Sequence, residues 1–472
     1  IRDSPKPLPP SYSMFPWSDA SDFDLQAQAS LLGYGLRAGQ ALDRPFYPTF
    51  LAILHVIGGQ DYATIARMQA FCFAVLPVLL YLIGSELLGY GFGLALFSVV
   101  SFWGMNLIKS NAFINTSTPI QFLSDFPAAI ALAFAIWRAI RWLKDDEPTL
   151  ANGVLFGAAA ALGSLVRYSL LGFLPFTLLI ILIKLQKNLP ALSKQVLFVA
   201  LGFLLVITPW TARNIITDSK YKLPLVSKIS YVIQHRYSSL IHEKTKAAQV
   251  VATETATTEN SQPSIQATPT KTPFNNSATK VTKTAAKQWF AAHLIHNIAS
   301  PFFVLPGHLS FESLNSAYNQ DPEVWQFDFN GWPSQSTSLA YILMAIGLIA
   351  GIVLLFKRNG TSTFILVAAY FGVTLANSFG RTSGGRYIVP TTWIILVFFI
   401  AIFSKLFVTD PKPQEQGSQR KSNKLVTAIL IAFLIGAIPL IWEGVSHLVF
   451  KPIAQPDLQT LIEYGKDRMG DK

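Results

Sequence analysis

The sequence has few charged side chains. Asp, Glu, Lys and Arg make up 13% of its 472 residues, against about 25% in an ordinary soluble domain, and hydrophobic residues make up 51%. A water-soluble fold would need surface polar groups that this chain lacks, so a soluble enzyme, a disordered scaffold and a nucleic-acid-binding domain are poor interpretations. The net charge of +11 instead fits a membrane protein with basic cytoplasmic loops and contacts to phosphate or lipid headgroups.

Cysteine and the common catalytic motifs are scarce as well. The single cysteine, Cys72, lies in an apolar run, which excludes an intrachain disulfide and a zinc–thiolate site. The sequence contains no P-loop, HExxH motif or GxSxG nucleophile elbow. His293 and His296 lie three residues apart without an evident third ligand, so we interpret them as interfacial histidines and assign no metal site. His55, in an apolar stretch, is interpreted as a packing residue.

Long apolar stretches are what the chain has in abundance. A bilayer is spanned by about 20 apolar residues. Ten candidate spans approach this template: 65–84, 92–109, 126–143, 152–166, 168–184, 195–212, 338–356, 362–379, 387–405 and 424–442. If residues 1–60 lie outside, the inner loops are 85–91, 144–151, 185–194, 357–361 and 406–423. All but the first carry or adjoin Lys and Arg, which is the positive-inside pattern.

The predicted fold class is therefore an all-α polytopic membrane protein. Its expected parts are a first outer segment 1–60, a transmembrane bundle 61–212, an outer loop 213–337, further transmembrane helices 338–442 and an outer tail 443–472. Residues 26–38 and 44–58 are too short to span and are expected to be interfacial helices. The Thr/Ser-rich stretch 244–285 has no apolar period and predicts a weakly ordered loop.

Four arginines fall on the outer side of this topology, where a positive-inside protein should have few: Arg44, Arg167, Arg213 and Arg386. Any one of them is explained by a side chain that reaches water at a helix end. The four together favour an anion site, because a guanidinium binds phosphate oxygens bidentately and keeps its proton. We expect them to bind a phosphate at the level of the outer headgroups.

Acidic residues form a second outer group: Asp19, Asp22, Asp24, Asp43 and Asp125. A carboxylate repels a nearby phosphate, unless it removes a proton from an attacking hydroxyl or amine, or binds a divalent cation. Helix capping is the alternative explanation. It is as good an explanation for Asp125, and the better one for Asp24.

These segments together resemble the GT-C superfamily of integral-membrane glycosyltransferases, in the branch of protein O-mannosyltransferases and the aminoarabinose transferase of lipid A. The similar residues, in order along 15–405, are Asp19 and Phe23 before LQAQASLLGYG; Asp43, Arg44 and Pro45 in DRPFYPTFLA; Arg167 in ALGSLVRYSLLGFLP; Trp210, Arg213 and Asn214 in PWTARN; and Arg386, Tyr387 and Pro390 in GRYIVP. Two features differ. Ala20 stands where the family has Glu after its first acid, and the family's opening membrane helix is absent or lies upstream of Ile1.

The resemblance implies a GT-C-like bundle of about ten to eleven transmembrane helices. It also implies inverting transfer of a sugar from a polyprenyl-phosphate donor to a lipid, glycan or protein acceptor, at the outer face of a prokaryotic plasma membrane. Asp19 would be the base, Asp43 or Asp125 the second acid. The donor-phosphate contacts would be Arg44, Arg167, Arg213, Arg386 and Tyr387, with Asp22, Trp210 and Asn214 in support. No cofactor is required, and a divalent metal stays open.

Two other functions stay open at this point. One is a non-catalytic GT-C-like subunit of a membrane complex. The other is a transporter of lipid-linked sugars, which would have charged or broken helices at the midplane and internal repeats. The acids at the outer boundary and the lack of an evident repeat count against the transporter.

Overall fold

The computed structural model describes residues 16, 19–36, 44–109, 117–144, 148–217, 222–236, 290–291, 293–295, 297–298, 335–380, 382, 386–406 and 424–450. Over these residues the chain is helical, with no strand. The helices are α1 (Asp19–Leu31), α2 (Phe46–Gly58), α3 (Tyr62–Cys72), α4 (Val75–Leu88), α5 (Tyr90–Lys109), α6 (Asp125–Lys144), α7 (Leu150–Val166), η1 (Tyr168–Gly172), α8 (Phe173–Leu185), α9 (Leu189–Ile216), α10 (Pro224–Arg236), α14 (Gln335–Arg358), α15 (Gly360–Phe379), α16 (Val389–Ile402), η4 (Ser404–Leu406) and α17 (Lys424–Val449).

All ten apolar stretches predicted from the sequence lie on helices. Within the described part of the chain, seven segments are long and apolar enough to cross a membrane: Tyr62–Leu88, Tyr90–Ile108, Asp125–Lys144, Tyr168–Leu185, Leu189–Ile216, Gly360–Phe379 and Lys424–Val449. The chain is thus a polytopic helical protein, as predicted. The first interfacial helix differs from its predicted range 26–38, because α1 already begins at Asp19 and ends at Leu31.

Capping side chains determine where several helices begin. Thr149 accepts a hydrogen bond from the Asn152 amide at the start of α7, and Asn188 and Asn359 cap α9 and α15 in the same way. Each cap satisfies a backbone donor that the first helical turn leaves without a partner. The connections at Asn188 and Asn359 are short, since three residues separate α8 from α9 and one separates α14 from α15.

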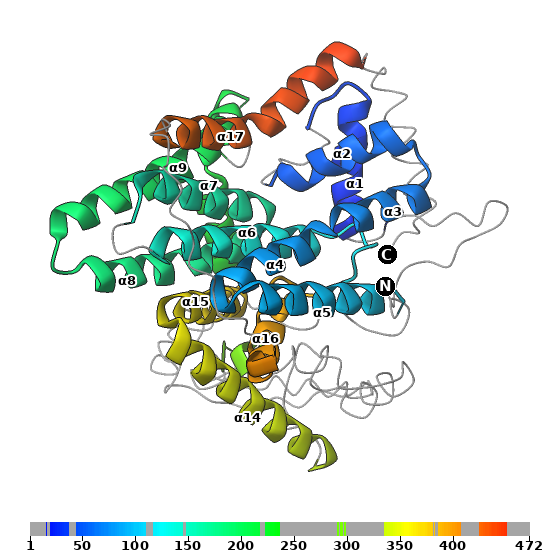
Figure 1. The fold of residues 1–472 in the computed structure, drawn as a ribbon. Coiled ribbons are helices and arrows are strands. Elements are labelled where there is room, and N and C mark those ends of the chain that lie inside the picture. Colours follow the sequence, from blue (N-terminus) through cyan, green and yellow to red (C-terminus); the bar gives the residue numbers. More distant parts are fainter. Residues whose placement is uncertain are drawn as a thin grey trace, which may run out of the picture.

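Helix α6 is the most deeply buried of the seven spans and forms the centre of the bundle. It contacts α4, α7, α15 and α16. Helices α7, α9 and α17 pack on one side of it and α14, α15 and α16 on the other (Figure 1). The pair α1 and α2 lies at one end of the bundle, against α17 (Figure 1).

Glycine allows the closest helix contacts. A Cβ added at Gly157 on α7 would overlap the Val199 carbonyl oxygen on α9, and one at Gly202 on α9 would overlap the Val154 carbonyl on α7. Small residues of this kind let two backbones approach within a membrane, where dispersion contacts replace the hydrophobic effect between helices.

The end of the bundle opposite α1 gathers the short loops predicted to lie inside. Glu86 accepts a hydrogen bond from Lys144 at 2.7 Å, and its carboxylate lies 3.7 Å from Arg141. Asn359 donates to the Glu86 carbonyl, and Lys184 donates to the Leu143 carbonyl at 2.8 Å. Residues in or beside four of the five predicted inner loops therefore meet at one end.

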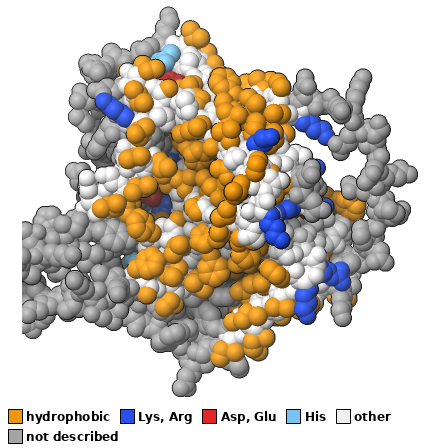
Figure 2. All heavy atoms as spheres, turned by 90° about the vertical axis from the view of Figure 1, so that its left-hand side faces the viewer, with side chains coloured by type: hydrophobic (Ala, Val, Ile, Leu, Met, Phe, Trp, Pro, Cys, Tyr) orange, Lys and Arg blue, Asp and Glu red, His pale blue; other side chains and the backbone are white. Residues whose placement is uncertain are grey.

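The exterior of the bundle is strongly apolar. Figure 2 views it from the left side of Figure 1 and shows hydrophobic side chains over most of the described surface, with basic side chains among them. Large exposed apolar side chains occur on α5, α9, α14 and α17. Such a surface suits contact with lipid chains.

We predict that Gly157→Val separates α7 from α9 and lowers the free energy of unfolding by about 2 kcal/mol or more, because backbone atoms of α9 leave no room for the side chain. Thermal unfolding in detergent micelles measures the change. Gly104→Val on α5 is the matched control, since nothing lies within 4 Å of its added Cβ. Equal losses in the two variants would contradict the close α7–α9 contact.

Candidate active site

Residues from five separate chain segments meet at the end of the bundle that carries α1. Asp19 begins α1, and Arg44 lies two residues before α2. Asp125 begins α6, Arg167 separates α7 from η1, and Arg386 lies three residues before α16. Since α6 runs from Asp125 to Lys144, this group lies at the opposite end from the Glu86 contacts.

The Asp125 carboxylate is the buried centre of this group. The residue has no exposed surface, and its Oδ2 accepts a hydrogen bond from Ser117 Oγ at 2.6 Å. Its Oδ1 forms an ion pair with Arg167, and Arg386 Nε lies 3.6 Å from its Oδ2. Arg167 is extended, with φ −156° and ψ 119°, which ends α7 and turns the chain into η1. Asp125 thus binds two arginines that come from opposite sides of α6.

Arg386 joins the buried acid to an exposed one. Its Nη2 lies 2.9 Å from Asp19 Oδ2, and the side chain of Asp19 is 52% exposed. The Nε atom of Arg386 is buried and makes no hydrogen bond among the described residues. This atom faces the Asp125 carboxylate at 3.6 Å, whose charge compensates it, while the side chain as a whole is 31% exposed.

Aromatic faces cover the three guanidinium groups. The Tyr387 ring centroid lies 5.1 Å from the Arg167 guanidinium and 5.5 Å from that of Arg386. Arg44 lies 5.5 Å from the Phe23 ring and 5.9 Å from the Tyr168 ring. These contacts orient the guanidinium planes without consuming their N–H donors.

The positive charges are close enough to act on one another. Burial, and then the positive charge of Arg386, lowers the pKa of the Arg167 guanidinium; Arg44 adds to this effect, and Tyr387 and Asp19 oppose it. An anion placed among the three arginines would relieve this repulsion. Burial and the negative charge of Asp19 raise the pKa of Asp22, which lies in the first turn of α1.

Arg213, predicted to be the fourth phosphate ligand, has other partners. Its Nη2 and Nε atoms donate to the two oxygens of Glu443 on α17, at 2.6 and 2.9 Å. The Arg213 guanidinium also lies over the Trp210 ring and donates to the Asn214 side chain and to the Leu36 carbonyl. Trp210 and Asn214 are fully buried. The structure therefore gives Arg213 a structural ion pair between α9 and α17, and the predicted set of four arginines becomes a set of three. Asp43 lies outside the described residues.

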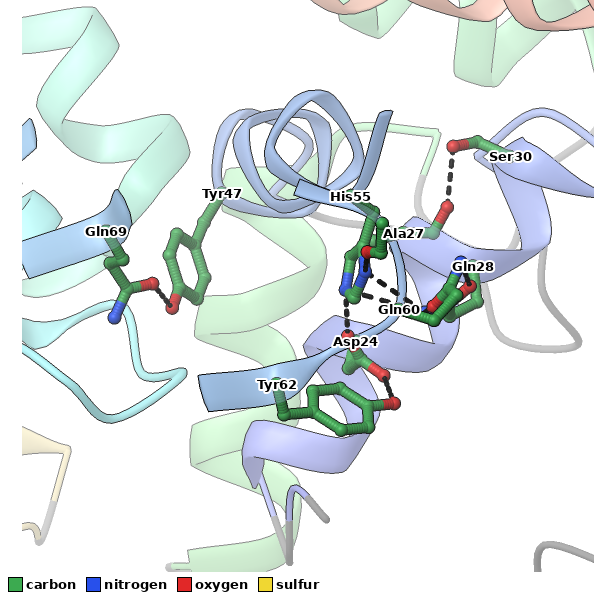
Figure 3. Close-up of polar contacts among 10 residues, drawn as sticks. Asp24, Ala27, Gln28, Ser30, Tyr47, His55, Gln60, Tyr62 and Gln69 are labelled. Atoms are coloured by element: carbon green, nitrogen blue, oxygen red, sulfur yellow. Dashed lines mark hydrogen bonds and ion pairs between the residues drawn. The ribbon is translucent and has the colours of Figure 1, made fainter. Parts of the chain in front are cut away.

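A buried acid and histidine join α1 to α2 (Figure 3). Asp24 Oδ1 lies 2.8 Å from His55 Nε2, and Tyr62 donates to Asp24 Oδ2 at 2.7 Å. We interpreted Asp24 as a helix cap and His55 as a packing residue. The cap interpretation is wrong, because Asp24 is the sixth residue of α1 and not its start. His55 is buried, as expected of a packing residue, and it is in addition paired with Asp24. The sequence does contain a pattern that indicates this buried face of α1. Asp24, Ala27 and Ser30 follow one another at intervals of three residues, which places them on the same side of a helix.

Two buried side-chain amides, to which the sequence analysis assigned no role, hold segments next to the candidate site. Gln69 on α3 accepts from the Tyr47 hydroxyl at 2.8 Å and donates to the carbonyls of Pro119 and Gln121, before Asp125. Asn377 on α15 donates to the Tyr387 carbonyl at 3.0 Å. They hold the segments that carry Asp125 and Arg386 in place.

The described part of the chain contains no group of three His, Cys, Asp or Glu residues suited to a metal ion. His293 is buried, and His296 lies outside the described residues. Comparison with protein-family models, curated proteins and solved structures found no match for this chain.

We predict that Asp125→Asn lowers the free energy of unfolding by about 3–5 kcal/mol, because Arg167 then keeps a buried charge without its counterion. Asparagine still accepts the Ser117 hydrogen bond, so the loss reports the charge. Chemical unfolding in detergent measures it, with the exposed cap residue variant Asp61→Asn as control. The double variant Asp125→Leu with Arg167→Met should recover most of the loss; a double variant as unstable as the single one would refute the pairing.

Proposed function

We propose that this protein is a membrane glycosyltransferase that moves a sugar from a polyprenyl-phosphate donor to an acceptor hydroxyl or amine. The observation that supports the proposal is the meeting of Arg44, Arg167 and Arg386 with Asp19 and Asp125 at one end of a membrane-spanning bundle. The proposed location of the reaction is the outer face of a prokaryotic plasma membrane.

The arginines have the chemistry that the leaving group requires. A lipid phosphate linked to a sugar carries one negative charge, and it gains a second when the bond from the anomeric carbon to the phosphate oxygen breaks. Guanidinium groups already oriented by Tyr387, Phe23 and Tyr168 would stabilise that second charge in the transition state. The Arg386 side chain is 31% exposed, so its guanidinium is accessible to a phosphate oxygen.

Asp19 and Asp125 differ in exposure, and we therefore assign them different roles. Asp19 is half exposed and can receive the proton of the acceptor hydroxyl while the hydroxyl oxygen forms its bond to the anomeric carbon. Asp125 is fully buried and paired, so it has no access to an acceptor. Its role is that of a positioning residue for Arg167 and Arg386.

A non-catalytic membrane subunit is the second candidate. The observation that favours it is that Arg167 and Asp125 already neutralise each other without a substrate. A scaffold needs only such internal ion pairs. The two candidates differ in one measurable property, which is sugar transfer from a prenyl-phosphate donor by the purified chain.

We predict that Asp19→Asn lowers kcat by about 10²–10⁴-fold, the usual contribution of a general base, while donor affinity stays within a few-fold. Transfer from a radiolabelled prenyl-phosphate sugar to an acceptor in detergent or nanodiscs measures it. Asp61→Asn is the matched control, because Asp61 is exposed and caps α3. Unchanged turnover in Asp19→Asn would overturn the base, and no transfer by the parent chain with any donor would favour the scaffold.

We predict that Arg386→Gln weakens binding of a prenyl phosphate by about tenfold or more, since charge-assisted hydrogen bonds contribute about 1.5–3 kcal/mol. Binding of the lipid phosphate without acceptor, followed by fluorescence or thermophoresis, separates this effect from catalysis. Arg67→Gln, at an exposed position of α3, should bind as the parent does. Equal affinities of the parent and Arg386→Gln would remove Arg386 from the phosphate site.

A further inference from the structure

The contact between α1 and α2 depends on one buried ionisable pair. His55 Nε2 lies 2.8 Å from Asp24 Oδ1, and His55 Nδ1 lies 3.0 Å from the Gly59 carbonyl oxygen. Tyr62, the first residue of α3, donates to the other oxygen of Asp24. The side chains of Asp24 and His55 are 7% and 0% exposed, so water contributes little to either. Figure 3 shows the histidine ring directly above the Asp24 carboxylate.

The geometry offers one acceptor to each ring nitrogen of His55, the Gly59 carbonyl oxygen and the Asp24 carboxylate. A doubly protonated ring can donate to both. A neutral imidazole has one N–H and loses one of the two contacts, together with the charge attraction to Asp24. The pair is therefore complete only as imidazolium and carboxylate.

The charges around His55 favour that state. From α1 the facing charged group is Asp24. The Tyr62 phenol on α3 is neutral, since it donates its proton to Asp24, and the nearby Gln28 and Gln60 amides are neutral as well. Burial lowers the pKa of His55, but the hydrogen bond and negative charge of Asp24, with the Gly59 carbonyl, outweigh it and raise the pKa above its usual 6.5. The neutral form becomes populated as the pH rises through this raised pKa.

The position of α1 on α2 bears directly on the candidate site. Asp19 begins α1 five residues before Asp24, and Arg44 lies two residues before α2. Between them, the Phe23 ring packs against Tyr47 on α2, with centroids 5.1 Å apart, and against Arg44. A shift of α1 along α2 would move Asp19 away from Arg386, whose segment is held by Asn377 on α15.

We propose that Asp24 and His55 form a positioning pair that holds Asp19 and Arg44 in register only while His55 carries its second proton. The effect on sugar transfer rests on the proposed function. The effect on the position of α1 does not, and it is a property of the fold alone.

The direction with pH follows from the protonated state being the complete one. Since the pKa of His55 is higher in the folded protein, the stabilisation is fully present below about pH 6.5 and is lost as the pH rises through the folded value. The kcat of the proposed sugar transfer should therefore fall at alkaline pH, and the loss of the second proton from His55 should cause this fall.

The activity test compares pH profiles of kcat. The parent should lose about tenfold or more between pH 6.5 and 9, His55→Gln should be low and flat over that range, and Asp61→Asn should follow the parent. A second variant, Asp24→Asn, removes the negative charge and keeps the shape of the side chain. It should also lose the fall in kcat at alkaline pH. A fall in kcat at alkaline pH that is retained in both variants would overturn the proposal.

A distance measurement tests the same pair without catalysis. Spin labels at Leu25→Cys on α1 and Phe71→Cys on α3, both exposed positions, are introduced into a Cys72→Ser background. We expect one narrow distance distribution at pH 6, a broader or shifted one at pH 9, and the broad form at both pH values in His55→Gln. Identical distributions at both pH values would overturn the positioning pair. A pH-dependent distance without sugar transfer would support the pair and refute the proposed function.

Discussion

A single carboxylate, that of Asp125, determines how the end of the bundle that carries α1 is arranged. It is completely buried at the start of the central helix α6, so its charge must be compensated by protein groups. Arg167 and Ser117 supply that compensation directly, and Arg386 contributes from the segment before α16. The halves of the bundle on either side of α6 are thus brought to the same acid, and the exposed Asp19 follows through Arg386.

These contacts belong to a longer ring of polar interactions. From Asp125 the ring continues through residues 117–124 to Gln69 on α3, then through Tyr47 to α2, and through His55 to Asp24 on α1. Asp19 on the same helix closes it at Arg386. The ring links α1, α2, α3, the segment before α6 and the segment before α16, which helps to explain why the short helices keep a defined position at the end of the bundle.

Much of the fold could be predicted from the sequence because the length of an apolar run is a local property. The grouping of Arg44, Arg167 and Arg386 also followed, since assigning loops to one side of a membrane already restricts which residues can meet. The partners could not be predicted. Glu443 lies 230 residues from Arg213, and His55 lies 31 residues from Asp24, and only the packing of α17 on α9 and of α2 on α1 brings each pair together.

The ion pair between Arg386 and Asp19 has a consequence for timing in the proposed reaction. Asp19, the proposed base, is paired with the same guanidinium that the proposal assigns to the lipid phosphate. In the proposed reaction, the donor phosphate would compete with Asp19 for Arg386. Binding of the donor would then release the Asp19 carboxylate for proton transfer, so the two steps would be coupled through one guanidinium.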